Sequence, residues 1–469
     1  MGFFNDHNHT YMSNLRLIDC INKPKDLIDR AIQLGLSGVA ITDHEALCCH
    51  IEVNKYAAEI REKYPDFTIA LGNEIYLTET REKKQPYYHF ILIAKDALGH
   101  KALRILSSKA WYNSYSSGNM LRVPTLKSEV AEVMKEYKGH VIATTACIGG
   151  EASKLLLEKY KLIQANISDN GIHFKLHSFI NWCIDTFGQD DFYIECAPGE
   201  SSEQIIANRM LLTHIAQPYG LKMVPGTDSH YLSKDLRFVH KAYLNSKDGD
   251  REVDTFYEYA YLMDEAECRT HLRASYDDAT IDWMFDCSEE MRRSISFYDL
   301  TKSQQIPLVE VKNYPKLYNV LNNQYNLLND LFSSDDIQER AWINDCWNRL
   351  IELGLNNNDE YLNRLQIEAD VIKDIGKHLN NCLFAYFNTF KHYIDLFWEC
   401  GSIVGPGRGS ATGFLSNYLL GITQLDPIKW NLQWWRFLNK ERAELPSLML
   451  ILGSIKRMNS LRGVCTKAC

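Results

Sequence analysis

The sequence predicts an α/β protein in which the first half of the chain forms one sheet surrounded by helices. Within the first 240 residues, short runs rich in β-branched and aromatic residues alternate with stretches whose apolar residues recur every three to four positions. The predicted strands are 3–9, 38–44, 67–77, 89–95, 140–147, 191–197 and 222–230. This alternation favours a parallel sheet with helical crossovers, either open or closed into a barrel. In both forms, functional side chains are expected at the carboxyl ends of the strands.

Composition and charge exclude several classes of protein. The 469 residues include 51 Lys and Arg against 60 Asp and Glu, a net charge of −9, and 45% are hydrophobic. This balance excludes a collagenous or wholly disordered chain and argues against one that coats nucleic acid through bulk charge, although it allows a local basic groove. No apolar run reaches the about 18 residues of a membrane span, and no signal region opens the chain, so a cytoplasmic location without membrane contact is expected. The 13 cysteines are scattered without a CxxC spacing, which favours free thiols.

The second half of the chain differs in composition and in hydrophobic pattern. Residues 251–360 are acidic, aromatic and helical in pattern, and we expect a mostly helical linker there. This linker would join a first domain over residues 1–250 to a second over 361–446. The last stretch, 447–469, contains no acidic residue and is expected to belong to neither domain.

Side chains that bind metals occur at one predicted strand end after another. They are His7, His9, Asp43, His44, Glu74, His89, Cys147, Asp228 and His230. Residues two apart in a strand face the same side, so His7 and His9 can point into one cavity. Imidazole with carboxylate suits Zn, Mn or Fe, and carboxylates can bridge two metals about 3.5–4 Å apart, as in phosphoester hydrolysis. One His-x-His is weak evidence by itself, but six such strand ends together predict a metal centre.

Other residues of these types are interpreted as structural. Cys48, Cys49 and His50 lie where a helix is expected to begin, and we interpret them as packing residues. His173 and His177 lie four apart on a predicted helix and could form a ligand pair, but a solvated or packed face is the favoured interpretation.

Six segments of the first half together resemble a known family. They are HNHTYMSN, GVAITDHEAL, LGNEIYL, HFILIAKD, ATTACIGGE and GTDSHYL, in that order. They resemble the polymerase-and-histidinol-phosphatase (PHP) domain, in particular the version at the front of bacterial DNA polymerase III alpha subunits. The resemblance implies a distorted seven-stranded α/β barrel whose strand ends hold a trinuclear cluster of Zn²⁺ or Mn²⁺, and 3′–5′ exonuclease activity. The ligands that it implies are His7, His9, Asp19, His44, Glu74, His89, Cys147, Asp228 and His230, with Asp19 matched only by the position of its loop.

A glycine-rich block, GPGRGSATG at 405–413, lies between an apolar strand-like run and an apolar helix-like run. Glycines let the backbone approach phosphates, and a helix N-terminus adds a partial positive charge. Arg408 would supply a charged donor and Ser410 a hydroxyl. The block is not a Walker loop, because no Gly-Lys-Ser/Thr follows at the required spacing.

The surroundings of this block resemble the start of the catalytic palm of the same alpha subunits. GSIVGPGRGSATGFLSNYLLGITQLDPIKWNLQWWRFLNKERAELP matches almost continuously, and YLNRLQIEADVIKDIG before it matches as well. The resemblance implies a partial α+β palm in which Arg408, Gly409, Ser410 and Arg442 bind the incoming nucleotide. The intact family extends a DNA primer-template with deoxynucleoside triphosphates and Mg²⁺, and its possible partners are a sliding clamp and a proofreading subunit. The pair Trp434-Trp435 departs from the family pattern and is interpreted as core.

The Asp-x-Asp that the family has after Pro446 is absent. Two-metal nucleotidyl transfer needs such carboxylates, so we expect that this chain by itself does not polymerise. One codon spelling of residues 448–453, LMLILG, contains Asp-Val-Asp-Phe in another frame. We therefore interpret 447–469 as an out-of-frame tail of a truncated gene.

Three functions stay open at this point. The first is that of a DNA polymerase III alpha-like fragment with a PHP phosphoesterase. The second is a free-standing PHP metallophosphatase of the histidinol-phosphatase type, against which the palm-like residues 364–446 argue. The third is a docking module without catalysis.

Overall fold

The computed structural model describes residues 2–15, 18–82, 85–117, 120–246, 255–302 and 305–441. They belong to two compact units, unit 1 (Met1–Thr301) and unit 2 (Lys302–Cys469). Unit 1 extends past the expected boundary at residue 250, because α10 (Glu265–Leu272) and α11 (Asp278–Arg293) pack against the sheet and its helices. Among the described residues, no helix combines the length and the apolar character that crossing a membrane requires.

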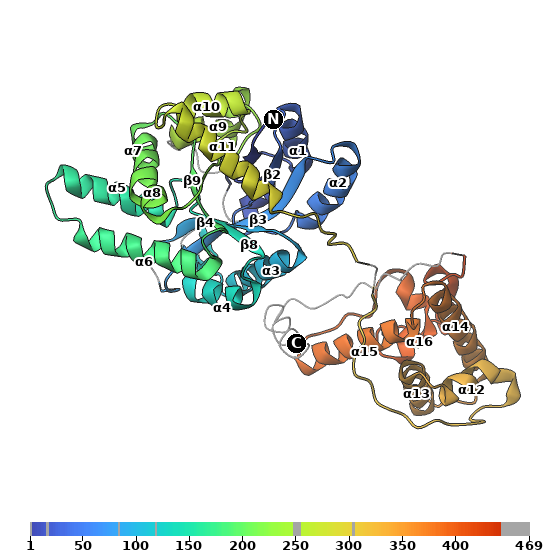
Figure 1. Ribbon diagram of the computed structural model, residues 1–469. Coiled ribbons are helices and arrows are strands. Elements are labelled where there is room, and N and C mark those ends of the chain that lie inside the picture. The colour runs from blue at the N-terminus through green and yellow to red at the C-terminus, as the bar shows by residue number, and fades with distance from the viewer. Residues whose placement is uncertain are drawn as a thin grey trace. The chain divides into compact units, whose positions relative to one another are not determined.

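Unit 1 is built on a nearly closed barrel of seven strands (Figure 1). Their order in the sheet is β1 (Phe4–Asn5), β2 (Gly38–Ile41), β3 (Thr68–Thr78), β4 (Tyr88–Ala94), β8 (Val141–Thr144), β9 (Phe192–Cys196) and β10 (Met223–Pro225). Asn8 and Ser229 form a parallel bridge, and the N–H of His9 donates to the carbonyl of Ser229 at 3.0 Å. The segments after β1 and β10 therefore join the two edges of the sheet, which confirms the predicted PHP-type barrel.

The direction of β4 differs from the parallel arrangement that the sequence suggested. β4 runs antiparallel to both β3 and β8. The connection from β3 to β4 covers only residues 79–87, and a parallel crossover needs about a dozen residues or more. Because of this reversal, the N-terminal end of β4 lies beside the carboxyl-terminal half of β3, where His89 pairs with Tyr76.

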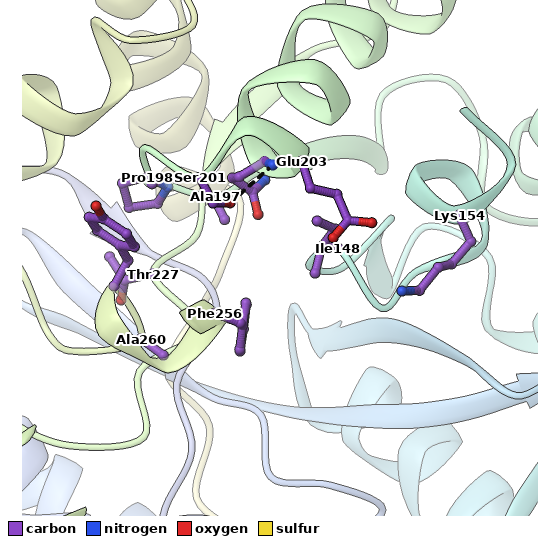
Figure 2. Close-up of a pocket in the computed structure, with 12 residues that line it drawn as sticks. Ile148, Lys154, Ala197, Pro198, Ser201, Glu203, Thr227, Phe256 and Ala260 are labelled. Carbon is purple, nitrogen blue, oxygen red and sulfur yellow. Dashed lines mark hydrogen bonds between the residues drawn. The ribbon is translucent and has the colours of Figure 1, made fainter. Parts of the chain in front are cut away.

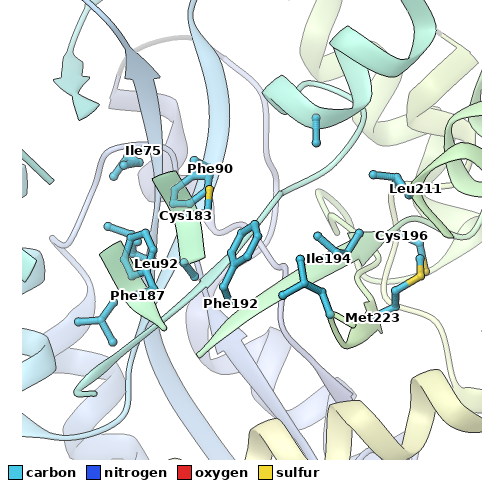
Figure 3. Packing of buried hydrophobic residues seen from close by; sticks show 14 of the residues in the cluster. Ile75, Phe90, Leu92, Cys183, Phe187, Phe192, Ile194, Cys196, Leu211 and Met223 are labelled. Carbon is cyan, nitrogen blue, oxygen red and sulfur yellow. The ribbon is translucent and has the colours of Figure 1, made fainter. Parts of the chain in front are cut away.

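The alternation of side chains along the strands separates two cores. Phe90, Leu92, Phe192 and Ile194 face the outer helices and are fully buried (Figure 3). The residues between them along each strand, such as Ile91, belong to a second cluster that α11 joins through Cys287 and Met291. Neighbouring residues of a strand point to opposite faces, so each strand contributes to both cores.

Nine further helices of unit 1 are described around this sheet (Figure 1). They are α1 (Pro24–Gln33), α2 (His50–Lys63), α3 (Ala97–Tyr112), α4 (Lys127–Tyr137), α5 (Glu151–Gln164), α6 (Asn170–Phe187), α7 (Ser202–Leu211), α8 (Gln217–Tyr219) and α9 (Arg237–Asn245). The short strand β7 (Pro124–Leu126) pairs with β3, and β5 (Tyr115–Ser117) pairs with β6 (Met120–Arg122).

The described part of unit 2 is helical. Its helices are α12 (Asn326–Ser333), α13 (Ile337–Glu352), α14 (Asp359–His378), α15 (Leu383–Glu399) and α16 (Leu415–Leu419). They enclose a core of their own around the fully buried Trp342. Residues 305–441 contain no strand of the expected α+β palm; the apolar run 402–404 is short, and its Ile403 is 62% exposed.

Candidate metal centre and glycine-rich block

The nine predicted ligands of unit 1 lie in one network of side-chain contacts at the end of the barrel where Asn8 and Ser229 meet. His7 and His9 follow β1, His44 follows β2, and Asp228 and His230 follow β10. Glu74 lies within β3, and His89 begins the reversed β4. Cys147 is buried after β8, with its Sγ 3.6 Å from Nδ1 of His89.

Glu74 occupies the middle of this network and is fully buried. Its Oε2 lies 2.5 Å from Nδ1 of His44 and 3.4 Å from Nε2 of His9. Its Oε1 lies 2.7 Å from Nδ1 of His89 and 3.5 Å from Nε2 of His7. One carboxylate therefore reaches four imidazoles from three different strand ends.

Asp228 contacts the two histidines that follow β1. Its Oδ1 lies 3.0 Å from Nε2 of His9 and 3.2 Å from Nε2 of His7. The backbone of Asp228 has a φ of 45°, in the left-handed region that Asp tolerates better than most residues. This turn follows β10 and directs the carboxylate toward β1.

Asp19 connects the other side of the network, although the sequence matched it only by loop position. Its Oδ2 lies 2.9 Å from Nε2 of His44 and 3.2 Å from Nε2 of His230. The hydroxyl of Tyr257 donates to its Oδ1 at 2.5 Å. Asp19 thus lies between imidazoles that follow β2 and β10, the two strands on either side of β1.

The donor atoms fit divalent cations. Three groups of residues each offer ligand atoms within 4.8 Å of one another: His9, His44 and His230; His7, His9 and Glu74; His44, Glu74 and His89. Both carboxylate oxygens of Glu74 and Oδ1 of Asp228 are buried without hydrogen-bond geometry, although ring nitrogens lie close to them. Imidazole and carboxylate together are the donors that Zn and Mn accept in proteins.

Burial and neighbouring charges shift the pKa values of these side chains in different directions. Burial, together with His44 and His230, lowers the pKa of His9 to about 3. Burial opposes protonation of His44 as well, but the carboxylates of Glu74 and Asp19 outweigh it and raise its pKa to about 10. Burial likewise opposes ionisation of Glu74, yet His89, His44 and His7 hold its pKa well below its usual range. Protons and cations would therefore compete for this site.

Glu195 is a site residue that the sequence reasoning missed. It lies in β9 and is 1% exposed. Its Oε1 is 2.6 Å from Nδ1 of His7, and the hydroxyl of Thr144 donates to its Oε2 at 2.8 Å. The signal was an acidic residue inside the otherwise apolar strand FYIEC. A carboxylate on Nδ1 of a histidine leaves Nε2 free to bind a metal.

Asp43 is a strand-end carboxylate with a structural role here. It accepts hydrogen bonds from the N–H and hydroxyl of Thr10, at 2.5 and 2.7 Å, and from the hydroxyl of Ser13 at 2.8 Å. Ser13 is in turn 3.0 Å from Nδ1 of His9. Asp43 thus holds the turn after β1 in place.

The remaining ligand-type residues lie in packing or surface positions. The interpretation of Cys48 as a packing residue is wrong, because Cys48 is exposed. Cys49 is buried as expected, with its thiol 3.3 Å from Asp43. Nδ1 of His50 lies 3.0 Å from Nε2 of a second histidine, His100. His177 lies on the exposed face of α6 and pairs with the hydroxyl of Tyr219.

The glycine-rich block of unit 2 presents Arg408, Gly409 and Ser410 on an exposed turn. Gly407 has a φ of 113°, and a Cβ there would lie 2.8 Å from Cγ2 of Thr412, so this position needs glycine. Arg442 lies outside the described residues. Trp434 packs against the core of unit 2 as expected, whereas Trp435 is exposed.

A buried carboxylate occupies the helix start that follows this block. Glu368 of α14 accepts hydrogen bonds from the N–H groups of Leu415 and Ser416 at 2.6 and 2.8 Å. Arg364, one turn earlier on α14, donates to the carbonyl of Gly413 at 3.3 Å. Because α16 is already capped in this way, the N–H groups of Leu415 and Ser416 are not free to bind a phosphate.

Part of each unit matches the model of a known family. Residues 6–198 match the PHP domain, and residues 339–461 match the bacterial DNA polymerase III alpha NTPase domain. The chain is related to the bacterial DNA polymerase III alpha subunits. The PHP match includes the predicted ligands from His7 to Cys147 and ends before Asp228 and His230. The polymerase III alpha match contains the glycine-rich block and continues past Ser447.

Several relatives align along nearly the whole chain. A DNA-directed DNA polymerase of Bacillus phage SPbeta is 37% identical, over 98% of this chain and 37% of the relative. The DNA polymerase III subunit alpha of Campylobacter jejuni is 26% identical, over 94% of this chain and 35% of the relative. The DNA polymerase III subunit alpha of Aquifex aeolicus is 27% identical, over 95% of this chain and 36% of the relative. The chain therefore spans little more than a third of the length of these relatives.

Proposed function

We propose that unit 1 is a metal-dependent phosphoesterase that removes nucleotides from the 3′ end of DNA. The observation that carries this proposal is the overlap of three donor groups through shared residues, with Glu74 common to two of them. When bound, divalent cations such as Zn²⁺ or Mn²⁺ lower the pKa of water and withdraw charge from phosphate oxygens.

Each part of the network has a role in this proposal. Glu74 would be a central ligand, because its two oxygens face different imidazoles. Asp19 would be a further ligand beside His44 and His230, and Asp228 would be one beside His7 and His9. Glu195 would orient His7 by accepting its Nδ1–H, so that Nε2 faces the cations. Cys147 would be a further ligand beside His89.

We further propose that the polymerase III alpha-like part of the chain corresponds to the nucleotide-binding side of a polymerase palm. Arg408, Gly409, Ser410 and Arg442 would contact a deoxynucleoside triphosphate, and DNA primer-template and Mg²⁺ would be needed by the complete enzyme. A sliding clamp, a proofreading subunit and a cytoplasmic location belong to the same proposal. The interpretation of 447–469 as an out-of-frame tail stays a prediction, and with it the expectation that this chain alone does not polymerise.

The test measures release of labelled nucleotide from the 3′ end of a primer by the purified full chain. We expect release that requires Mn²⁺ or Zn²⁺, stops with a chelator, and is lost in a His9→Ala, Asp228→Ala double variant. A Glu59→Gln variant serves as the control, since Glu59 is exposed on α2. Absence of bound metal in elemental analysis of the wild-type chain would refute the proposal.

A further inference from the structure

A small cavity lies at the ends of the same barrel strands (Figure 2). Its volume is about 90 Å³, and its walls include Ile148 after β8, Ala197 and Pro198 after β9, and Thr227 after β10. The segment 256–260 completes the cavity, with Phe256 and Ala260 facing Ala197 and Pro198 across the space in Figure 2.

Three wall residues adjoin predicted metal ligands. Ile148 follows Cys147 directly, and Thr227 directly precedes Asp228. The carbonyl of Ala260 accepts a hydrogen bond from the N–H of His230 at 2.8 Å. Consecutive Cα atoms are about 3.8 Å apart, so the backbone segments that line the cavity at Ile148 and Thr227 continue directly into the predicted ligands Cys147 and Asp228.

The cavity wall combines apolar and polar residues, and the polar Gln204 and Thr227 are buried in it. Phe256 and Tyr259 contribute rings, whereas Lys154 and Glu203 are exposed. A Cβ at Gly199 would lie 3.6 Å from the ring of Tyr259 and 3.3 Å from the side chain of Gln204, so glycine keeps this wall open. The volume is well below the about 300–1,000 Å³ of pockets for whole ligands, so the cavity suits one ring system of a larger substrate.

We propose that this cavity binds the base of the terminal nucleotide whose phosphate is held at the metal centre. The inference rests on the proposed phosphoesterase function and adds to it the place where the base of the substrate nucleotide binds. Aromatic side chains stack on any base, so the cavity would accept different bases without reading the sequence. This tolerance is what removal of successive nucleotides requires.

Two variants test the cavity in the full chain. Tyr259→Ala removes a stacking surface, and Ile148→Trp fills the cavity. The matched control is Tyr219→Ala, a partly buried tyrosine whose hydroxyl pairs with His177 on α6. The substrates are thymidine 5′-(p-nitrophenyl phosphate), which carries a base, and bis(p-nitrophenyl) phosphate, which does not.

We expect kcat/KM for the thymidine ester to fall about tenfold in both variants, the scale of one stacked base. In both variants, kcat/KM for bis(p-nitrophenyl) phosphate and the number of metal ions bound per chain should equal those of the Tyr219→Ala control. A second readout without metal is the binding of thymidine 5′-monophosphate in the presence of EDTA, which both variants should weaken. An equal loss on both esters, or no loss on either, would overturn the inference.

The same measurements separate this inference from the proposed function. If the wild-type chain binds no metal and cleaves neither ester, the phosphoesterase proposal fails. Binding of thymidine 5′-monophosphate that Tyr259→Ala weakens and Tyr219→Ala preserves would still support the base-binding cavity. Binding of thymidine 5′-monophosphate that neither Tyr259→Ala nor Ile148→Trp weakens would overturn the base-binding cavity.

Discussion

Glu195 allows a sharp test of the candidate metal centre, because it touches one histidine of the network and none of the cations' other expected ligands. The substitution Glu195→Gln keeps the size of a side chain that is 1% exposed. It removes the negative charge 2.6 Å from Nδ1 of His7 but leaves a carbonyl oxygen that can accept from Nδ1–H, while the new NH2 group can donate to the hydroxyl of Thr144. The change therefore acts on the orientation and basicity of His7 with little change in packing.

The expected magnitude follows from these two contacts. A hydrogen bond to a charged group contributes about 1.5–3 kcal/mol, and one between neutral groups about 0.5–1.5 kcal/mol. The substitution should thus weaken the hydrogen bond that orients His7 by about 1–1.5 kcal/mol, which corresponds to roughly tenfold lower metal affinity. His7 belongs to the group with His9 and Glu74, and it is absent from the group of His44, Glu74 and His89. The loss should therefore affect one part of the cluster first.

The assay is the number of metal ions retained per chain after dialysis against a series of chelator concentrations. Wild type and the Glu59→Gln control should release their metal at the same concentration. Glu195→Gln should release part of its metal at a concentration about tenfold lower. Unchanged retention at every chelator concentration would refute the role of Glu195, and simultaneous loss of all metal would refute its restriction to the His7 side.

Three further predictions concern stability. Removal of metal with EDTA should lower the midpoint of thermal unfolding of unit 1, and added Zn²⁺ or Mn²⁺ should restore it. The reason is that a ligand at 100 times its Kd stabilises the folded state by about 2.7 kcal/mol. An unchanged midpoint would contradict a metal centre. Burial raises the pKa of Glu368 to about 7, so above about pH 4.5 the folded state holds a proton that the unfolded chain has released. The free energy of unfolding should therefore fall between about pH 4.5 and 7, by up to about 3 kcal/mol. The measurement is the protection of the Leu415 and Ser416 amides from hydrogen exchange, which should fall over the same range. Glu368→Gln should remove this pH dependence, and persistence of the same slope would contradict it. Gly407→Ala should destabilise unit 2 by about 1–3 kcal/mol in urea unfolding, because φ is 113° and the new Cβ would meet Thr412; a neutral effect would show that the turn can relax.

Local sequence pattern was sufficient to locate most of the elements that carry the site. Alternating apolar residues predicted the strands that carry Glu74 and Ile194, and ligand-type residues at strand ends predicted a metal centre. Such patterns depend only on the period of a strand or a helix, so they can be read from neighbouring residues. The position of Asp19 was less certain, since a loop has no period. Glu195 was missed because its contact with His7 joins residues 188 positions apart, which no local pattern shows.

The sequence by itself determined which side chains are available: imidazoles, carboxylates and a thiol at strand ends, and a glycine-rich block between two apolar runs. Only the tertiary structure decided how they meet. The reversal of β4 places His89 against Glu74, and the bridge from Asn8 to Ser229 brings the end of β10 to the end of β1. The direction of a strand and the closure of a barrel depend on contacts between residues more than 200 positions apart, such as this bridge, and no local period encodes them.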